Sequence, residues 1–164
     1  MRKILIFGGL GCAGLIGMVV VGFFVLASLG PDTSIYTGRQ VPKRFVSTID
    51  SLGLLEDDER IRYFYSDALF DIKDGFYFVT DSKLVVYSDA WAEPETIIPF
   101  EEIESLEAEY NDSFLTDSMV FVTTLTDLEV SFPVSSEGGL DKKFVQLIQE
   151  GRGLRTPVEA PAGY

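Results

Sequence analysis

An uninterrupted apolar segment, residues 4–29, constrains this chain more than any other feature. It follows Arg2 and Lys3, and Ser28 is its only conventionally polar residue. At ~1.5 Å per residue, a helix of about 26 residues reaches about 39 Å, more than the ~30 Å hydrocarbon thickness of a bilayer. The sequence therefore predicts a membrane-spanning helix at residues 4–29, in an N-terminal anchor at residues 1–29.

Two processing alternatives compete with an uncleaved anchor. Val25-Leu26-Ala27 places small residues where a signal peptidase cleaves, so an exported protein with a cleaved signal peptide is the first alternative. The apolar region of a signal peptide is usually only ~7–15 residues long, which favours the anchor. Lipoprotein processing at Cys12 is the second, and it would require a large aliphatic residue where the chain has Gly9.

Small residues recur every four positions in the predicted span, at Gly9, Ala13 and Gly17. Such a stripe allows two helix backbones to approach closely, although glycine is common in membrane helices in general. These three residues are the candidates for a weak pairing of membrane helices between copies of the chain.

The residue types beyond the span restrict the chemistry. Cys12 is the only cysteine and histidine is absent, so thiolate metal sites and Ser-His or Cys-His catalysis are excluded from residues 30–164. We therefore predict no catalytic residues, no metal ligands and no cofactor. With 13 Phe and 7 Tyr in the chain, this part has the apolar bulk for one folded domain.

Charge is distributed unevenly along the chain. Residues 45–150 contain 24 acidic and 6 basic residues, a net charge of −18, whereas the flanks are basic and the whole chain carries −13. Nucleic-acid phosphates and anionic lipid surfaces repel such a body. We expect no nucleic-acid partner and a protein partner with a basic surface.

The hydrophobic pattern predicts the elements in order. Residues 30–54 read as a polar linker ending in a short amphipathic helix, Pro42–Leu54. Short β-rich runs separated by turn residues then indicate an antiparallel sheet structure. The predicted strands are residues 60–66, 76–80, 84–87, 96–98, 106–110, 119–125 and 128–134. An amphipathic helix from Leu140, with Gly151 as its C-cap, precedes a flexible tail at residues 151–164.

Five glutamates make the densest carboxylate group: Glu101, Glu102, Glu104, Glu107 and Glu109. Successive side chains of a strand point to opposite faces, so these carboxylates cannot all meet at one ion. Within the strand, Leu106, Ala108 and Tyr110 are expected to face the core. We interpret the glutamates as a solvated acidic edge.

The run Phe76-Tyr77-Phe78-Val79-Thr80-Asp81-Ser82-Lys83, continued to Ser88, and the run Ile98-Pro99-Phe100-Glu101-Glu102-Ile103 resemble bacterial pleckstrin-homology-like (PH-like, GRAM-related) domains. The resemblance covers about residues 55–150 and implies a mainly β (α+β) domain. The implied fold is an antiparallel barrel or sandwich of about seven strands, closed by a C-terminal helix. In the loop where eukaryotic relatives hold phosphoinositides, this chain has Lys73 alone among three aspartates, so phosphoinositide binding is not expected.

Three apolar side chains in predicted loops, Trp91, Phe114 and Leu115, are candidate partner contacts. The alternative is that they fold back over the barrel, since large aromatic residues are mostly buried. The resulting hypothesis is a non-enzymatic, single-pass, membrane-anchored interaction module that presents an acidic domain to a protein partner. A lipid-binding sensor at the membrane surface is the alternative.

The charges beside the span bear on its orientation. Arg2 and Lys3 favour an N-terminus on the cytoplasmic side, whereas Arg39, Lys43 and Arg44 favour the reverse. The nearer charges usually dominate, so we expect a bacterial plasma or inner membrane protein with its domain outside. The cytoplasmic habit of PH-like domains argues for the other side.

Overall fold

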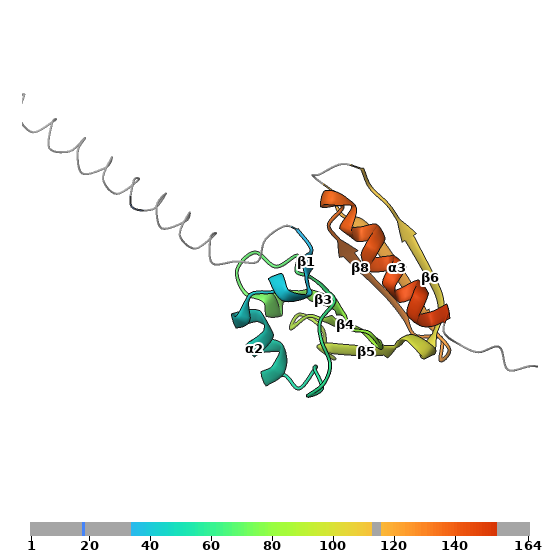
Figure 1. Ribbon diagram of the computed structural model, residues 1–164, viewed down its shortest axis with the longest axis horizontal. Helices are drawn as coiled ribbons and strands as arrows, with labels where there is room; N and C mark the ends of the chain where they lie inside the picture. Colours follow the sequence, from blue (N-terminus) through green and yellow to red (C-terminus); the bar gives the residue numbers. More distant parts are fainter. Residues whose placement is uncertain (1–17, 19–33, 113–115, 154–164) are drawn as a thin grey trace, which may run out of the picture.

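The computed structural model describes residue 18, residues 34–112 and residues 116–153. These residues form two antiparallel sheets, a helix before them and a helix after them (Figure 1). The first sheet, sheet A, contains β1 (Tyr36–Thr37), β2 (Tyr63–Tyr65), β3 (Phe76–Val79), β4 (Lys83–Tyr87) and β5 (Glu95–Pro99). The second, sheet B, contains β6 (Ile103–Glu109), β7 (Ser118–Thr124) and β8 (Glu129–Val134). The helices are α2 (Lys43–Ser51) and α3 (Leu140–Gly153), and single 3-10 turns are η1 (Gly38–Gln40), η2 (Ile72–Asp74), η3 (Phe100–Glu102) and η4 (Glu137–Gly139).

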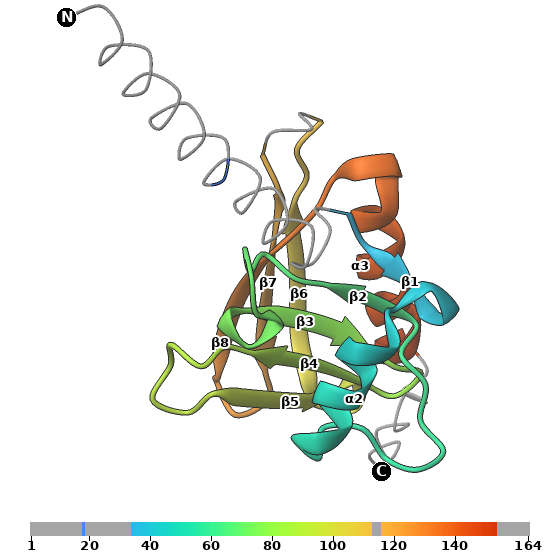
Figure 2. The same ribbon diagram turned by 90° about the vertical axis from the view of Figure 1, so that its left-hand side faces the viewer.

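Sheet A is the middle layer of the domain, and both of its faces are covered. All four residues of β3 are buried, which is why its sequence is apolar throughout rather than alternating. Phe64, Phe78 and Val85 lie side by side on neighbouring strands and face α2. The opposite face packs on sheet B and α3 (Figure 2).

Helix α2 has sequence-encoded boundaries and an apolar side. Pro42 precedes its first turn, where a missing N–H costs nothing, and Gly53 follows with φ +72°, a left-handed conformation that favours glycine. Phe45 and Ile49, one turn apart, are buried against sheet A, and the Phe45 and Phe64 rings stack with centroids 5.7 Å apart. The predicted helix at Pro42–Leu54 is therefore confirmed, with slightly narrower bounds.

Helix α3 packs in the space between the two sheets. The buried Phe144 ring lies 6.1 Å from that of Phe132 on β8, and Asp141 accepts a 2.7 Å hydrogen bond from the hydroxyl of Ser118 on β7. The sequence predicted a C-cap at Gly151, and that prediction was wrong, because α3 continues to Gly153. Gly151 is instead a packing position: a Cβ there would lie only 2.0 Å from the Phe100 ring.

The structure confirms a mainly β domain of two antiparallel sheets with a C-terminal helix. It differs from the sequence-based expectation in the predicted linker, where β1 pairs with β2 and Ile35 and Val41 are buried. Tyr110 was expected in the core but is 46% exposed, because it lies beyond the last residue of β6.

The predicted span at residues 4–29 falls outside the described residues except for Met18, and Gly9, Ala13 and Gly17 fall outside them too. Within residues 34–112 and 116–153, and at residue 18, no helix has the length and apolar character needed to cross a bilayer.

Candidate functional site

The outer face of sheet B combines exposed apolar side chains with carboxylates. On its middle strand, Phe121 lies opposite Glu107 of β6, and Met119 lies opposite Glu109. Glu129, on β8, completes the group next to Thr123. We call these five residues, Glu107, Glu109, Met119, Phe121 and Glu129, the acidic face.

Alternation along the strands creates the acidic face. The residues between its members, such as Val120 and Val122, point inward and are buried, which turns their neighbours toward solvent. Phe121 keeps 38% of its surface exposed and borders an open hollow of about 490 Å³. Within the described part of the chain, none of the three glutamates forms an ion pair.

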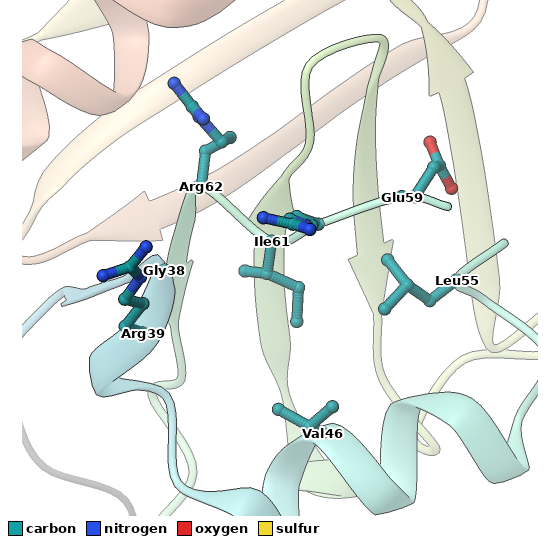
Figure 3. A pocket seen from close by; sticks show the side chains of 8 residues that line it. Gly38, Arg39, Val46, Leu55, Glu59, Ile61 and Arg62 are labelled. Atoms are coloured by element: carbon teal, nitrogen blue, oxygen red, sulfur yellow. The ribbon is translucent and has the colours of Figure 1, made fainter. Parts of the chain in front are cut away.

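A second surface lies on the other side of sheet A, where α2, η1 and the loop before β2 meet. It is a pocket of about 420 Å³ with an apolar floor made by Val46, Leu55 and Ile61. Figure 3 shows these three side chains pointing into the space between α2 and the sheet. Three arginines complete the lining, and we call the whole the arginine pocket: Arg39, Arg60 and Arg62, with Val46, Leu55 and Ile61.

Carboxylates lie close to these arginines in the sequence, since Glu56, Asp57 and Asp58 are exposed in the same loop as Arg60. Arg62 lies 3.3 Å from Asp81, but both side chains are more than half exposed, so this pair contributes little. Arg39 and Arg60 have no ion-pair partner among residues 34–112 and 116–153. A guanidinium group without an ion-pair partner can bind a carboxylate or a phosphate through two parallel hydrogen bonds.

A nearly buried ion pair fixes the loop that carries Arg60 and Arg62. Lys83 Nζ lies 2.6 Å from Glu59 Oε2, and the hydroxyl of Ser82 donates a 2.9 Å hydrogen bond to the other carboxylate oxygen. Burial alone would raise the pKa of Glu59. Hydrogen bonds from Lys83, the backbone of Glu56 and Ser82, together with the Lys83 charge, lower this pKa below its usual value of 4.5. The carboxylate that lines the pocket is therefore already occupied.

Two tyrosine–carboxylate pairs lie side by side on sheet A. Tyr65 donates a 2.6 Å hydrogen bond to Asp117, and Tyr77 donates to Asp67 at 3.2 Å. Burial, with the neighbouring carboxylates, raises the pKa of both phenols, which keeps them protonated as donors. The described residues contain no group of three or more metal-ligating side chains.

Of the three residues predicted as partner contacts, the structure describes Trp91, which belongs to neither surface. Trp91, between β4 and β5, keeps 40% of its surface exposed. Phe114 and Leu115 lie outside the described residues. The five glutamates of residues 101–109 are all exposed, in agreement with a solvated acidic edge, and Glu107 and Glu109 share the acidic face.

Sequence reasoning missed the arginine pocket because Arg39 was assigned to a linker and lies 21 positions before Arg60. The alternation Arg60-Ile61-Arg62 was the available signal. In an extended segment alternate residues point to opposite sides, so this pattern predicts a buried Ile61 with Arg60 and Arg62 at the surface.

No family model matches the chain, and no curated protein matches it. One solved structure similar to part of it is a DUF1696 family protein with a pleckstrin-homology domain from Shewanella loihica PV-4. The two share 12% identity over 65% of this chain and 92% of that one, with a TM-score of 0.47. Another is a pleckstrin homology domain from Shewanella amazonensis SB2B, at 11% identity over 78% of this chain and 98% of that one, with a TM-score of 0.47.

Proposed function

We propose that this protein is a non-enzymatic interaction module, held at a membrane by residues 4–29, which presents its acidic face to a basic protein surface. The observation that carries the proposal is the exposed Phe121 among Glu107, Glu109 and Glu129. An aromatic side chain surrounded by carboxylates offers both an apolar anchor and a charge pattern that selects its partner.

The physical reason is that this face resembles an interface rather than an ordinary strand surface. Phe121 and Met119 are neighbours of glutamates that have no ion-pair partner in the described residues. A basic partner would desolvate Phe121 and Met119 while its lysines or arginines compensate the carboxylates at the edge. Such edge charges mainly set the association rate and the choice of partner, and their effect weakens with salt.

The membrane part of the proposal comes from the length and composition of residues 4–29. We place the anchor in a bacterial plasma membrane, where the charges of Arg2 and Lys3 beside the span favour a domain on the outside. The anchor would confine the acidic face near the bilayer, where a partner of modest affinity is still captured.

The test is site-specific photocross-linking in intact cells, with the full chain carrying a photoreactive phenylalanine analogue at position 121. We expect an adduct with a protein that is lost at high salt and lost when Glu107, Glu109 and Glu129 are all changed to arginine. The analogue at Gln146, on the exposed side of α3, is the control position. An adduct that survives the three substitutions, or the same adduct from position 146, would contradict the proposal.

The anchor is tested separately in the same cells. We expect the chain to remain in the membrane fraction after alkaline carbonate extraction and to be released when residues 4–29 are deleted. Extraction of the intact chain by carbonate would disprove the anchor without affecting the cross-linking result.

A further inference from the structure

An exposed apolar pair marks the loop between β2 and η2. Leu69 is 77% exposed and Phe70 is 53% exposed, and Ala68 precedes them, so three successive residues carry no charge. Among the described residues, no other two neighbours in the chain are both large, apolar and more than half exposed. Single exposed apolar side chains are normal on a protein surface, whereas a contiguous exposed group marks a contact site.

Hydrogen bonds hold the base of this loop. The hydroxyl of Ser66 donates to the backbone carbonyl just before β3, and Tyr77 donates to Asp67 at 3.2 Å. At the other side of the loop, the Asp71 carboxylate accepts a 3.1 Å hydrogen bond from the Lys73 amide. Polar groups are therefore engaged at the base of the loop, and the apolar side chains stand at its tip.

The loop lies at the end of the domain where the chain enters. Tyr36 of β1 lies opposite Phe64 of β2 in an antiparallel pair, so the residues before Tyr36 run toward Ser66, where the loop begins. Figure 2 shows this loop and the ends of β6 and β7 that face each other across residues 110–117 toward one end of the domain. The β7–β8 turn lies at the opposite end (Figure 2).

The length of chain between the predicted span and the domain limits how far this end can lie from the bilayer. The span ends at residue 29 and the described domain begins at Ser34, which leaves residues 30–33 between them. Even fully extended, such a segment reaches only about 18 Å, at ~3.3–3.6 Å per residue. An end of the domain that is tethered so closely is held against the headgroups.

We propose that the β2–η2 loop contacts the same bilayer that holds residues 4–29, with Leu69 and Phe70 inserted at the boundary between headgroups and acyl chains. This inference rests on the membrane anchor of the proposed function and adds the orientation of the domain to it. Elements that lie at this boundary bury their apolar side chains about 5–10 Å deep. Removal of apolar surface from water stabilises the contact, and the tether raises the effective concentration of lipid at the loop.

The charges around the tip suit a zwitterionic lipid surface. Residues 66–75 contain three aspartates and Lys73, a net charge of −2. Arg44, at the start of α2, lines the same hollow of about 200 Å³ as Phe70, and together with Lys43 it adds +2. The strong negative charge of the whole domain is therefore balanced at the tip, and anionic headgroups should not strengthen the contact.

This contact determines how the acidic face is presented. Strands β6 and β7 run from the bilayer end of the domain toward the β7–β8 turn (Figure 2), so the outer face of sheet B stands beside the membrane rather than against it. A basic partner would then reach Phe121 by moving parallel to the bilayer.

The experiment uses the full chain reconstituted in phosphatidylcholine vesicles, with Cys12→Ser and a fluorescent dye on Ala68→Cys. We expect lipids that carry a nitroxide on the acyl chain to quench this dye strongly and aqueous iodide to quench it weakly. The same dye on Leu128→Cys, beside the β7–β8 turn and 47% exposed in the unmodified chain, is the control and should show the reverse order.

Substitutions separate the apolar pair from the tether. With the dye at position 68, L69S/F70S should lower the ratio of lipid quenching to iodide quenching severalfold. L125S/L128S removes two exposed leucines at the opposite end and should leave this ratio unchanged. Leu69→Ser alone should give a smaller loss in the same direction, and it keeps the test valid if Phe70 is needed for folding. Phosphatidylglycerol added to the vesicles should not raise the ratio.

The outcomes separate this inference from the proposed function. Release of the chain by alkaline carbonate would overturn the anchor and the loop contact together. Retention of the chain with no lipid quenching at position 68 would overturn the loop contact alone. Lipid quenching that survives both serine variants would show that the tether, without the apolar pair, brings the loop to the lipid. Protection from iodide in cells but not in vesicles would assign the loop to a protein and contradict the bilayer contact.

Discussion

Lys83 anchors the loop before β2 through an ion pair with Glu59. Its ammonium group is nearly buried and lies 2.6 Å from the Glu59 carboxylate, which is nearly buried as well. Removing the cation would leave a carboxylate in a poorly solvated place, and that uncompensated charge is the costly part.

We expect Lys83→Met to lower the free energy of unfolding by about 3 kcal/mol in urea titrations. The double variant Lys83→Met with Glu59→Leu should recover much of the loss, because it removes the unpaired charge. Equal destabilisation in the single and double variants would show that the lysine stem, rather than the ion pair, carries the effect.

The same pair makes the domain sensitive to acid. The pKa of Glu59 is lower in the folded state than its usual value of 4.5. Its ionised form therefore contributes stability above about pH 4.5, and that contribution is lost as the pH falls through the lower folded-state value. We expect the stability of the unmodified chain to fall more steeply below pH 4.5 than that of Glu59→Gln, measured by urea unfolding at a series of pH values.

Among the elements, α3 depends on one close approach. A Cβ at Gly151 would lie 2.0 Å from the ring of Phe100, and that ring is only 3% exposed, so it has little room to move. We expect Gly151→Ala to destabilise the fold by about 1–3 kcal/mol in thermal or urea unfolding, although alanine is the better helix former.

Gly153 provides the matched control, because nothing lies within 4 Å of a Cβ at that position. Gly153→Ala should leave stability unchanged or raise it slightly. If both substitutions change the stability by the same amount, contact with Phe100 is not the reason that residue 151 is glycine.

The elements also show which parts of the fold were predictable. The β3–β4 hairpin and both helices follow from local pattern, since β3 and β4 are short apolar runs on either side of an Asp-Ser turn. Strand β1 has only two residues and no periodicity of its own, so only its pairing with β2 defines it. The acidic side of β6 was predicted from alternation, whereas Phe121 was placed beside it only by strand register.

At the scale of the whole molecule, α2 and β1 belong to the folded domain. Phe45 and Ile49 cover Phe64, Phe76 and Phe78 of sheet A, all of them almost fully buried. The domain boundary predicted at residue 55 would expose this entire face to water, at a cost comparable with the 5–15 kcal/mol that stabilise a typical domain.

We therefore expect residues 34–153 to unfold cooperatively and residues 55–153 to fail to fold, as judged by near-ultraviolet circular dichroism and dispersion of amide resonances. A well-dispersed spectrum from the shorter fragment would contradict the assignment of α2 to the core. The longer fragment serves as the positive control.

The charge asymmetry is likewise a property of the whole molecule. The charge count gave a strongly negative body over residues 45–150 and left Arg39 in a basic flank, 21 positions before Arg60. Folding brings these arginines to one pocket and leaves the acidic face on the far side of sheet A. Net charge alone could not reveal this separation.

Strand β1 has a mechanical consequence. It is the first strand of the described domain, and it is held to β2 over two residues, with a further 2.9 Å bond from the Gly38 amide to the Arg62 carbonyl. Tension applied through the preceding chain would act on these few hydrogen bonds one after another, which is a low-force peeling geometry. Continued pulling would next detach η1 and its Arg39, so that a stretched copy would lose its arginine pocket while both sheets remained folded.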